Sequence, residues 1–192
     1  MDKIRPALSS DASSILDIYA PYILNTIVSF ETEVPTVKDF SQRIIANEES
    51  WPWLVYESDG FIAGYAYASK HRERAAYQWC VETSVYMDDR FQQKGMATKL
   101  YQTLFEILKY QGCRNVYAGI TLPNEKSVHF HEKMGFKKIA DYKNIGYKFN
   151  RWNTVRWYEL QLNDYSDAPA PFIKWKDIQS KDRQRIMNQP GK

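Results

Sequence analysis

The sequence predicts an α/β fold in which helices cover both faces of a mixed sheet of about seven strands. Two observations lead to this prediction. Strand-like and helix-like apolar periodicities alternate along the chain, and Asp59-Gly60, between two apolar runs, is a strong signal for a hairpin. The chain has 192 residues, 44% of them hydrophobic, which is enough for one domain with a substantial core.

The elements are expected in the order strand, two helices, three strands, helix, strand, helix and two strands. Ser10 or Asp11 can cap the first helix, and Thr36-x-x-Asp39 is a variant capping box for the second. Gly112 is placed to end the third helix in a left-handed conformation, and Asn124 can cap the fourth. The expected strands cover residues 4–6, 53–57, 61–69, 80–87, 115–120, 136–149 and 152–161, and the helices follow apolar positions within 15–23, 36–47, 97–108 and 124–134.

The turn Gln92-x-x-Gly95-x-Ala97, between the central strand and its helix, has features of a phosphate site. Gly95 stands where a side chain would block a closely approaching ligand, and amides at a helix N-terminus attract anions. No Gly-Lys-Ser/Thr follows, as it does in a P-loop, and the three-glycine dinucleotide fingerprint is missing. The simpler alternative is that this strand–turn–helix junction just needs one glycine.

Composition excludes several classes of function. A net charge of +3 is too small to indicate nucleic-acid binding. Cys80 and Cys113 lack a CxxC partner and a metal-type spacing, so we expect reduced thiols and a cytoplasmic location. Cys and Asp do not cluster around His71, His129 and His131, and no metal is expected. The chain has no run of about 18 apolar residues, and no membrane contact is expected.

The character of the chain changes after Asn163. Residues 164–171 are linker-like, with two prolines, and residues 172–192 are polar and basic. We therefore expect one domain over residues 1–163 and a partly ordered C-terminal tail over 164–192. The alternative for this tail is a contact with RNA or a partner.

The turn at Gly95 resembles the pyrophosphate loop of the GNAT acetyltransferases, whose pattern is Gln or Arg, x, x, Gly, x, Gly or Ala. Over roughly residues 4–162 the chain is similar to the phosphinothricin N-acetyltransferases. The matching segments are Trp51-Pro52-Trp53-Leu54-Val55, Ala76-Tyr77-Gln78-Trp79, Glu82-x-Ser84-Val85-Tyr86, Leu122-Pro123-Asn124, Val128-His129-Phe130-His131-Glu132-x-x-Gly135-Phe136 and Gly146-Tyr147-Lys148-x-x-x-Trp152.

This resemblance implies the GNAT fold, a homodimer, and transfer of the acetyl group of acetyl-CoA to the amino group of a small amino acid analogue such as phosphinothricin or methionine sulfoximine. An α-ammonium must first lose a proton to a base. By position Glu82 is that base, and desolvation in an apolar strand would suit the role. The alternative for Glu82 is a solvent-facing residue or a structural ion pair.

His131 stands where many GNAT enzymes carry a tyrosine that is proposed to protonate the departing thiolate. A hydrogen-bonded helix histidine without a catalytic role is the alternative. The resemblance places acetyl-CoA on the main chain of a splayed strand, on the turn, and on Asn124. The implied contacts are Val85, Tyr86, Met87, Gln93, Lys94, Gly95, Met96, Ala97, Thr98 and Asn124.

The acceptor positions implied by the resemblance are Phe30, Arg72, Arg74 and Tyr77. Arginine forks suit a carboxylate and a phosphinate through charge-assisted hydrogen bonds, although His71-Arg72-Glu73-Arg74 is otherwise a solvated charge run. Tyr101 also matches, and either lines the site or belongs to the core. The sequence departs from the family at Thr121, where relatives carry glycine, so the acyl or acceptor pocket is expected to differ there.

The sequence is also compatible with two other functions. The same fold acetylates protein or peptide N-termini, and a non-catalytic acyl-CoA-binding module is a third possibility. The paired arginines favour a small dianionic acceptor over a peptide. The presence of both Glu82 and His131 favours an enzyme over a binding module.

Overall fold

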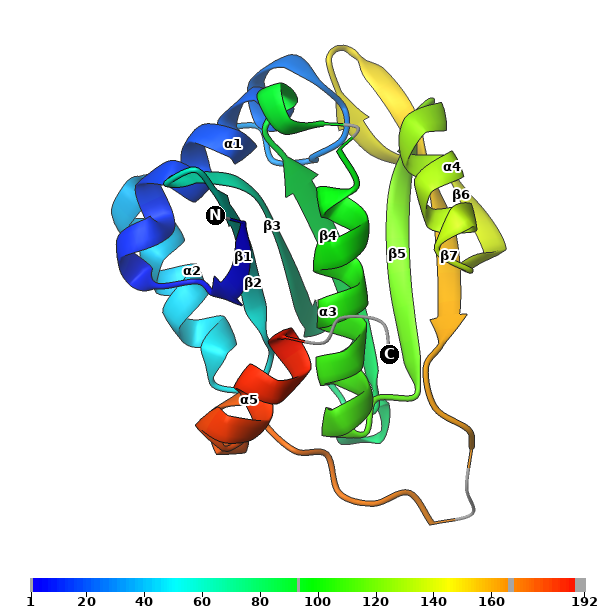
Figure 1. The fold of residues 1–192 in the computed structure, drawn as a ribbon. Coiled ribbons are helices and arrows are strands. Elements are labelled where there is room, and N and C mark those ends of the chain that lie inside the picture. Colours follow the sequence, from blue (N-terminus) through cyan, green and yellow to red (C-terminus); the bar gives the residue numbers. More distant parts are fainter. Residues whose placement is uncertain (1, 93, 166–167, 189–192) are drawn as a thin grey trace.

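The computed structural model describes residues 2–92, 94–165 and 168–188. In these residues seven strands form one sheet in the order β1-β2-β3-β4-β5-β7-β6 (Figure 1). The mixed sheet of seven strands with helices on both faces is as predicted. No described helix is long and apolar enough to cross a membrane. The elements are β1 (Lys3–Pro6), α1 (Ala12–Asn25), α2 (Val37–Glu48), β2 (Trp53–Ser58), β3 (Phe61–Lys70), β4 (Cys80–Met87), α3 (Met96–Gln111), β5 (Asn115–Leu122), α4 (Glu125–Lys133), β6 (Lys137–Lys148), β7 (Arg151–Gln161) and α5 (Ser180–Met187).

The central pair of strands separates along its length. Strands β4 and β5 are parallel and pair only from Cys80–Asn115 to Glu82–Tyr117. Beyond that point β4 keeps its antiparallel pairing with β3 as far as Met87, and β5 keeps its pairing with β7 as far as Leu122. Among the described residues, the facing edges of β4 and β5 therefore stop supplying hydrogen-bond partners to each other, although main-chain groups need such partners.

Several local signals in the sequence are confirmed. Asp59 and Gly60 both have positive φ, at 51° and 83°, as a tight hairpin requires. Gly112 ends α3 in the left-handed conformation, and its N–H donates to Leu108 O and Lys109 O. The Thr36 hydroxyl accepts from Asp39 N–H at the start of α2, and Asn124 accepts from Ser127 N–H at the start of α4.

Of the two predicted caps of the first helix, Ser10 and Asp11, it is Asp11 that occupies the N-cap position of α1. Its carboxylate, however, makes no capping hydrogen bond to the helix N-terminus. It accepts instead from Leu8 N–H at 2.7 Å and from the guanidinium of Arg5 at 2.7 and 3.0 Å. A charge-assisted, bidentate partner is stronger than a helix amide, and it also holds the pKa of Asp11 below its ordinary value against the opposing effect of burial.

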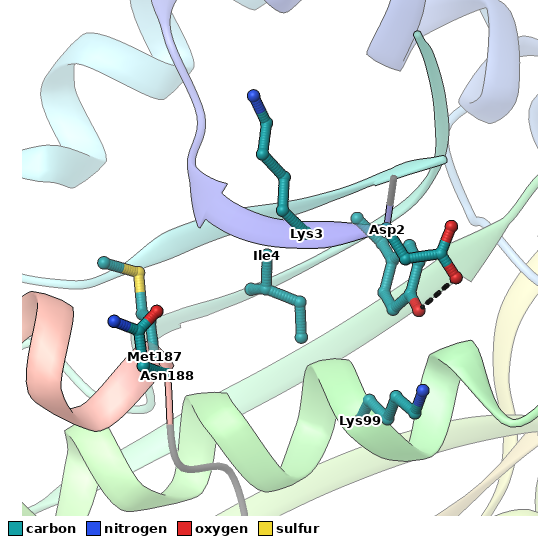
Figure 2. A pocket seen from close by; sticks show the side chains of 7 residues that line it. Asp2, Lys3, Ile4, Lys99, Met187 and Asn188 are labelled. Atoms are coloured by element: carbon teal, nitrogen blue, oxygen red, sulfur yellow. Dashed lines mark hydrogen bonds between the residues drawn. The ribbon is translucent and has the colours of Figure 1, made fainter. Parts of the chain in front are cut away.

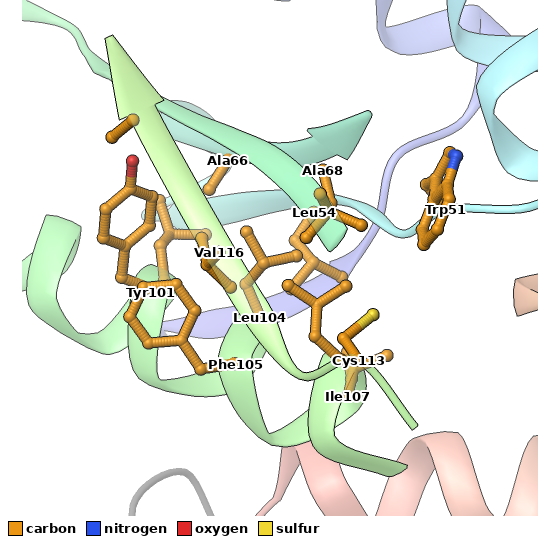
Figure 3. Packing of buried hydrophobic residues seen from close by; sticks show 14 of the residues in the cluster. Trp51, Leu54, Ala66, Ala68, Tyr101, Leu104, Phe105, Ile107, Cys113 and Val116 are labelled. Atoms are coloured by element: carbon orange, nitrogen blue, oxygen red, sulfur yellow. The ribbon is translucent and has the colours of Figure 1, made fainter. Parts of the chain in front are cut away.

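Two apolar cores lie on opposite faces of the sheet. Helix α3 packs its buried face, including Leu104 and Ile107, onto Leu54, Ala66 and Val116 of the sheet (Figure 3). On the other face α1 and α2 pack onto β2 and β3. Full burial of one such aliphatic side chain contributes roughly 1.5–3 kcal/mol, so these contacts stabilise the central strands between two helical layers.

The C-terminal segment, expected to be a partly ordered tail, packs against the domain through several of residues 168–188. Trp175 is buried under the guanidinium of Arg183, whose Cζ lies 4.1 Å from the ring centroid. The side-chain amide of Gln111 in α3 donates to Ile173 O at 2.8 Å, and Phe172 packs on Trp51. The C-terminal segment is held against the domain by a few large apolar residues within an otherwise polar sequence. The division of the chain at residue 163 stays a prediction.

Candidate active site

The turn before α3 has the geometry of an anion site. Gly95 is left-handed, with φ 76°, and nothing lies within 4 Å of a Cβ placed on it. Its carbonyl accepts the first helical hydrogen bond, from Lys99 N–H, which leaves the preceding amides, those of Met96, Ala97 and Thr98, at the open end of the helix. Lys94 is exposed beside them. Gln93, predicted to bind the same group, lies outside the described residues.

The predicted pantetheine contacts lie on the free edge of β4. Val85, Tyr86 and Met87 pair with β3 on one side. On the other side they lie beyond Glu82, the last residue of β4 that pairs with β5. Met87 packs against Gly64, where a Cβ would overlap its sulfur. The main-chain carbonyl of Met87 accepts a hydrogen bond from the Tyr22 hydroxyl at 2.7 Å, and its second lone pair is free for another donor.

Glu82 is the last residue of β4 that pairs with β5, and it is not desolvated as expected. Its side chain is 35% exposed, and its Oε1 lies 2.9 Å from Nδ1 of His71. The His71 ring is stacked on Tyr117 at 4.4 Å and lies edge-on to Trp157 at 6.1 Å. If Glu82 instead forms a structural ion pair, its partner is His71. The sequence did not indicate this contact.

His131 is buried on α4 between two hydrogen-bond partners. Its Nδ1 lies 2.8 Å from Ser127 O, which fixes the hydrogen on that nitrogen. Its Nε2 therefore accepts from the Tyr101 hydroxyl at 3.2 Å. Burial lowers the pKa of His131, against a smaller opposing effect of the Ser127 carbonyl. Burial likewise raises the pKa of Tyr101, so the imidazole is neutral and the phenol keeps its proton.

Thr83 adds a third polar group to this cluster. It is 5% exposed, and its hydroxyl lies close to the Tyr101 phenol but makes no hydrogen bond of ordinary geometry to that phenol or to another described residue. An unsatisfied buried hydroxyl costs roughly 1–3 kcal/mol unless a ligand supplies the missing bond. The hydroxyls of Thr83 and Tyr101 thus form a polar spot on the α3 side of the diverging strands.

The residues predicted to bind the acceptor come from two separate loops. Phe30 is 39% exposed, and its ring packs on Gly146 in β6, where a Cβ would overlap it. The Phe30 loop is held by Lys148, whose buried ammonium donates to Ile23 O at 2.6 Å and Ser29 O at 2.7 Å. The contact of Lys148 with this loop was not predicted, because it joins segments more than 100 residues apart.

Arg72, Arg74 and Tyr77 lie in an exposed loop, residues 71–79, which we name the acceptor loop. Within the described residues neither guanidinium group has a hydrogen-bonded or ion-paired protein partner. Thr121 is buried on β5, on the same face as Tyr117. The structure therefore brings Glu82 and the root of this loop together, through His71, and leaves both guanidinium groups available to a ligand.

A hollow of about 280 Å³ lies between β1, α3 and α5 (Figure 2). Lys3 and Lys99 line it with Asp2, whose carboxylate accepts from the hydroxyls of Tyr56 and Ser58. None of the residues predicted to bind a ligand lines this hollow. In the part of the chain that the structure describes, His, Cys, Asp and Glu side chains form no group of three or more that could hold a metal.

The diverging strands, the glycine turn at a helix start and the polar groups on both faces define an acyl-CoA-type transferase site. The chain matches the family "Acetyltransferase (GNAT) domain" over residues 4–157, and it belongs to that family. It is thus an acetyltransferase, as predicted.

Two curated relatives are similar along most of their length. The chain is 36% identical over 169 residues to phosphinothricin N-acetyltransferase of Streptomyces viridochromogenes, covering 88% of this chain and 90% of the relative. It is 31% identical over 171 residues to the L-methionine sulfoximine/L-methionine sulfone acetyltransferase of Salmonella typhimurium, covering 87% and 98%. A phosphinothricin acetyltransferase from Sinorhizobium meliloti, solved with acetyl-CoA, superimposes with a TM-score of 0.82 at 26% identity, covering 91% and 98%.

Proposed function

We propose that this protein transfers the acetyl group of acetyl-CoA to the α-amino group of a small amino acid analogue with a second anionic or strongly polar group. Phosphinothricin and methionine sulfoximine, named for two relatives, are the acceptors to test first. The observation that carries this proposal is the separation of β4 from β5 directly after Glu82. It leaves the carboxylate of Glu82, which we propose as the base, on one face of the opening and two hydroxyls on the other.

Acetyl-CoA supplies the activated acetyl group, and this chain's main-chain groups suit its polar parts. The amides of Met96, Ala97 and Thr98, with Gly95 and Lys94, would hold the pyrophosphate. The free edge of β4 from Val85 to Met87 would pair with the pantetheine amides. The side-chain oxygen of Asn124 is used in its cap, so its NH₂ group is the part that remains for this ligand.

Glu82 is proposed to take the proton from the acceptor's ammonium. One of its oxygens is engaged by His71, and the other is free to face the incoming amine. The exposed third of the side chain gives the proton a route to water afterwards. The neutral amine then attacks the thioester carbon, and N–H donors along the free edge of β4 are available to the developing oxyanion.

The role proposed for His131 is narrower than the sequence indicated. A neutral imidazole whose Nδ1 hydrogen is donated to Ser127 O has no proton to give to sulfur. We assign to the Tyr101 hydroxyl a hydrogen bond to the departing sulfur, which would form as its hydrogen turns from Nε2 of His131, and CoA would leave as a thiolate that takes its proton from water. His131 would then hold the Tyr101 hydroxyl in place, and its effect on catalysis would pass through that residue.

The acceptor's acidic groups are proposed to bind Arg72 and Arg74. Both guanidiniums are exposed and lack protein partners among the described residues, so a carboxylate or phosphinate would meet them without breaking an existing ion pair. Phe30 and Tyr77 would cover the rest of the ligand. Thr121 would narrow the space that a glycine leaves in relatives.

A homodimer is part of the proposal. Six large apolar side chains are exposed on the β6–β7 hairpin, and β6 is an edge strand, so a second copy of this surface would cover both. They are Ile139, Tyr142, Ile145, Tyr147, Phe149 and Trp152. Light scattering at micromolar concentration should give twice the chain mass, and Trp152→Glu should give the monomer. Phe61→Glu, at an exposed site on β3, is the control. A monomeric wild type contradicts the dimer.

We place the reaction in the cytoplasm, because both cysteines are free thiols.

The deciding experiment measures acetyl-CoA-dependent thiol release with four acceptors. These are phosphinothricin, methionine sulfoximine, alanine and a peptide with a free N-terminus. We expect kcat/KM to be highest for one of the first two. If the peptide is the best acceptor, the protein is an N-terminal acetyltransferase, and if acetyl-CoA binds without thiol release for any acceptor, it is a binding module.

A further inference from the structure

We propose that His71 is a positioning residue for the base Glu82, an inference that rests on the proposed function. The two side chains meet at 2.9 Å, from Nδ1 of His71 to Oε1 of Glu82. The side chain of His71 is only 15% exposed, although His71 is the first residue of the exposed acceptor loop. This burial indicates that its contact with Glu82 is a fixed part of the fold.

The His71 ring is held on two sides. It is stacked on Tyr117 with an interplanar angle of 21°, and Trp157 meets its edge at 72°. Tyr117 is also the strand partner of Glu82 in the last β4–β5 pair. The imidazole therefore sits over the point where the two strands begin to separate, next to the proposed reaction site.

This arrangement limits the orientation of the carboxylate. A hydrogen bond from His71 occupies Oε1, so Oε2 carries the lone pair that faces an incoming ammonium. Glutamate has three side-chain torsions and loses much conformational freedom when it is held in one geometry. A ring fixed by two aromatic contacts provides that restraint before the acceptor binds, which lowers the cost of reaching the reactive geometry.

His71 also joins the base to the acceptor loop. Strand β3 ends at Lys70, and the loop with Arg72 and Arg74 starts at the next residue. Anchoring the loop and orienting Glu82 are separable functions, because loss of the anchor raises the acceptor KM whereas misorientation of Glu82 lowers kcat.

Two substitutions separate the hydrogen bond from the ring packing. His71→Phe keeps a ring on Tyr117 and removes the donor, whereas His71→Asn keeps a donor near the Nδ1 position and removes the ring. His71→Leu, which also lacks a donor, replaces His71→Phe if that variant does not fold. His129→Phe is the matched control, because His129 is exposed on α4.

We expect His71→Phe to lower kcat about 10-fold to 100-fold, as for loss of a hydrogen bond to a charged group. The KM values for acetyl-CoA and acceptor should be unchanged, and His71→Asn should recover most of the lost kcat. In a Glu82→Gln background, His71→Phe should cause little further loss, because the two residues act together.

Three results would overturn the inference. The first is a wild-type kcat for His71→Phe, and the second is a raised acceptor KM with unchanged kcat in that variant. The third is that His71→Phe lowers kcat by the same factor in the Glu82→Gln background as in the wild type. If Glu82→Gln itself keeps full activity, or the wild type uses no acceptor, the proposed function has failed. If Glu82→Gln is inactive while His71→Phe is active, only the role of His71 has failed.

Discussion

Glu82 and Thr83 are consecutive in β4, and their side chains face opposite sides of the sheet. Glu82 lies with His71 and Tyr117 on one face, and Thr83 lies with Tyr101 on the face covered by α3. A reacting carbon can reach both groups only where the sheet is open. The end of the β4–β5 pairing at Glu82 provides that opening, so in the proposed reaction the base and the hydroxyl groups would approach the thioester from opposite sides.

Glu82→Gln should lower kcat by about 10²–10⁴, the usual range for one general base, while the KM for acetyl-CoA stays unchanged. The substitution keeps the shape of the side chain and its contact with His71. Steady-state kinetics with the best acceptor is the measurement. Glu73→Gln, at a 91% exposed carboxylate in the acceptor loop, is the control. Near-full activity of Glu82→Gln at neutral pH would remove Glu82 from this role.

Gly95→Val should weaken acetyl-CoA binding, because a branched side chain would fill the space in front of the α3 amides. The substitution also strains a backbone with φ 76°. Gly60→Val is the matched control, because Gly60 has φ 83° and equally open surroundings, but lies in the β2–β3 turn. Titration calorimetry on both folded variants separates the two effects, and equal affinities would contradict a pyrophosphate site at this turn.

Tyr101→Phe should lower kcat about 10-fold or more and should also destabilise the fold by roughly 1–3 kcal/mol, because it leaves Nε2 of buried His131 without a donor. Kinetics and denaturant unfolding measure the two effects. Tyr110→Phe removes an exposed hydroxyl from the same helix and is the control. Unchanged kcat in Tyr101→Phe, with the expected loss of stability, would show that the Tyr101–His131 pair is structural only.

The stability of the protein should decrease as pH falls from about 7 to about 5, in part through His131. Burial depresses its pKa below 6.5 in the folded state. As pH falls, the unfolded chain therefore binds this proton first, which favours unfolding. His131→Gln does not titrate and should give a shallower slope of unfolding free energy against pH. His129→Gln is the exposed control, and parallel slopes for wild type and His131→Gln would contradict the assignment.

Arg74→Ala should reduce kcat/KM for phosphinothricin by about one to two decades, because removal of a charge-assisted hydrogen bond costs roughly 1.5–3 kcal/mol. Alanine as acceptor should be affected less, and the KM for acetyl-CoA should not change. Thr121 gives a reason to expect methionine sulfoximine to be used better than phosphinothricin. The control is Arg185→Ala, at an exposed arginine in α5. An equal loss for every acceptor would contradict recognition of the second anionic group.

Some features of this protein are determined by residues close together in the sequence. The Asp59-Gly60 hairpin, the left-handed Gly112 and the Thr36 and Asn124 caps each satisfy a local conformation or a helix-end hydrogen bond. The Asp11 cap failed because Arg5, on a strand, offered a stronger partner. Local patterns also led to the acetyltransferase family, since its turn and motifs are contiguous in sequence.

The tertiary structure decided the contacts between distant segments. His71 reaches Glu82 because β3 and β4 are antiparallel neighbours and Lys70 pairs with Val81. Tyr101 meets His131 because two helices pack on one face of the sheet, and no periodicity predicts that geometry. Such contacts depend on strand register and helix packing, which follow from burial of the whole core. The sequence by itself therefore determined the family and the chemistry that its residues can perform, whereas the folded chain decided which of those residues act together.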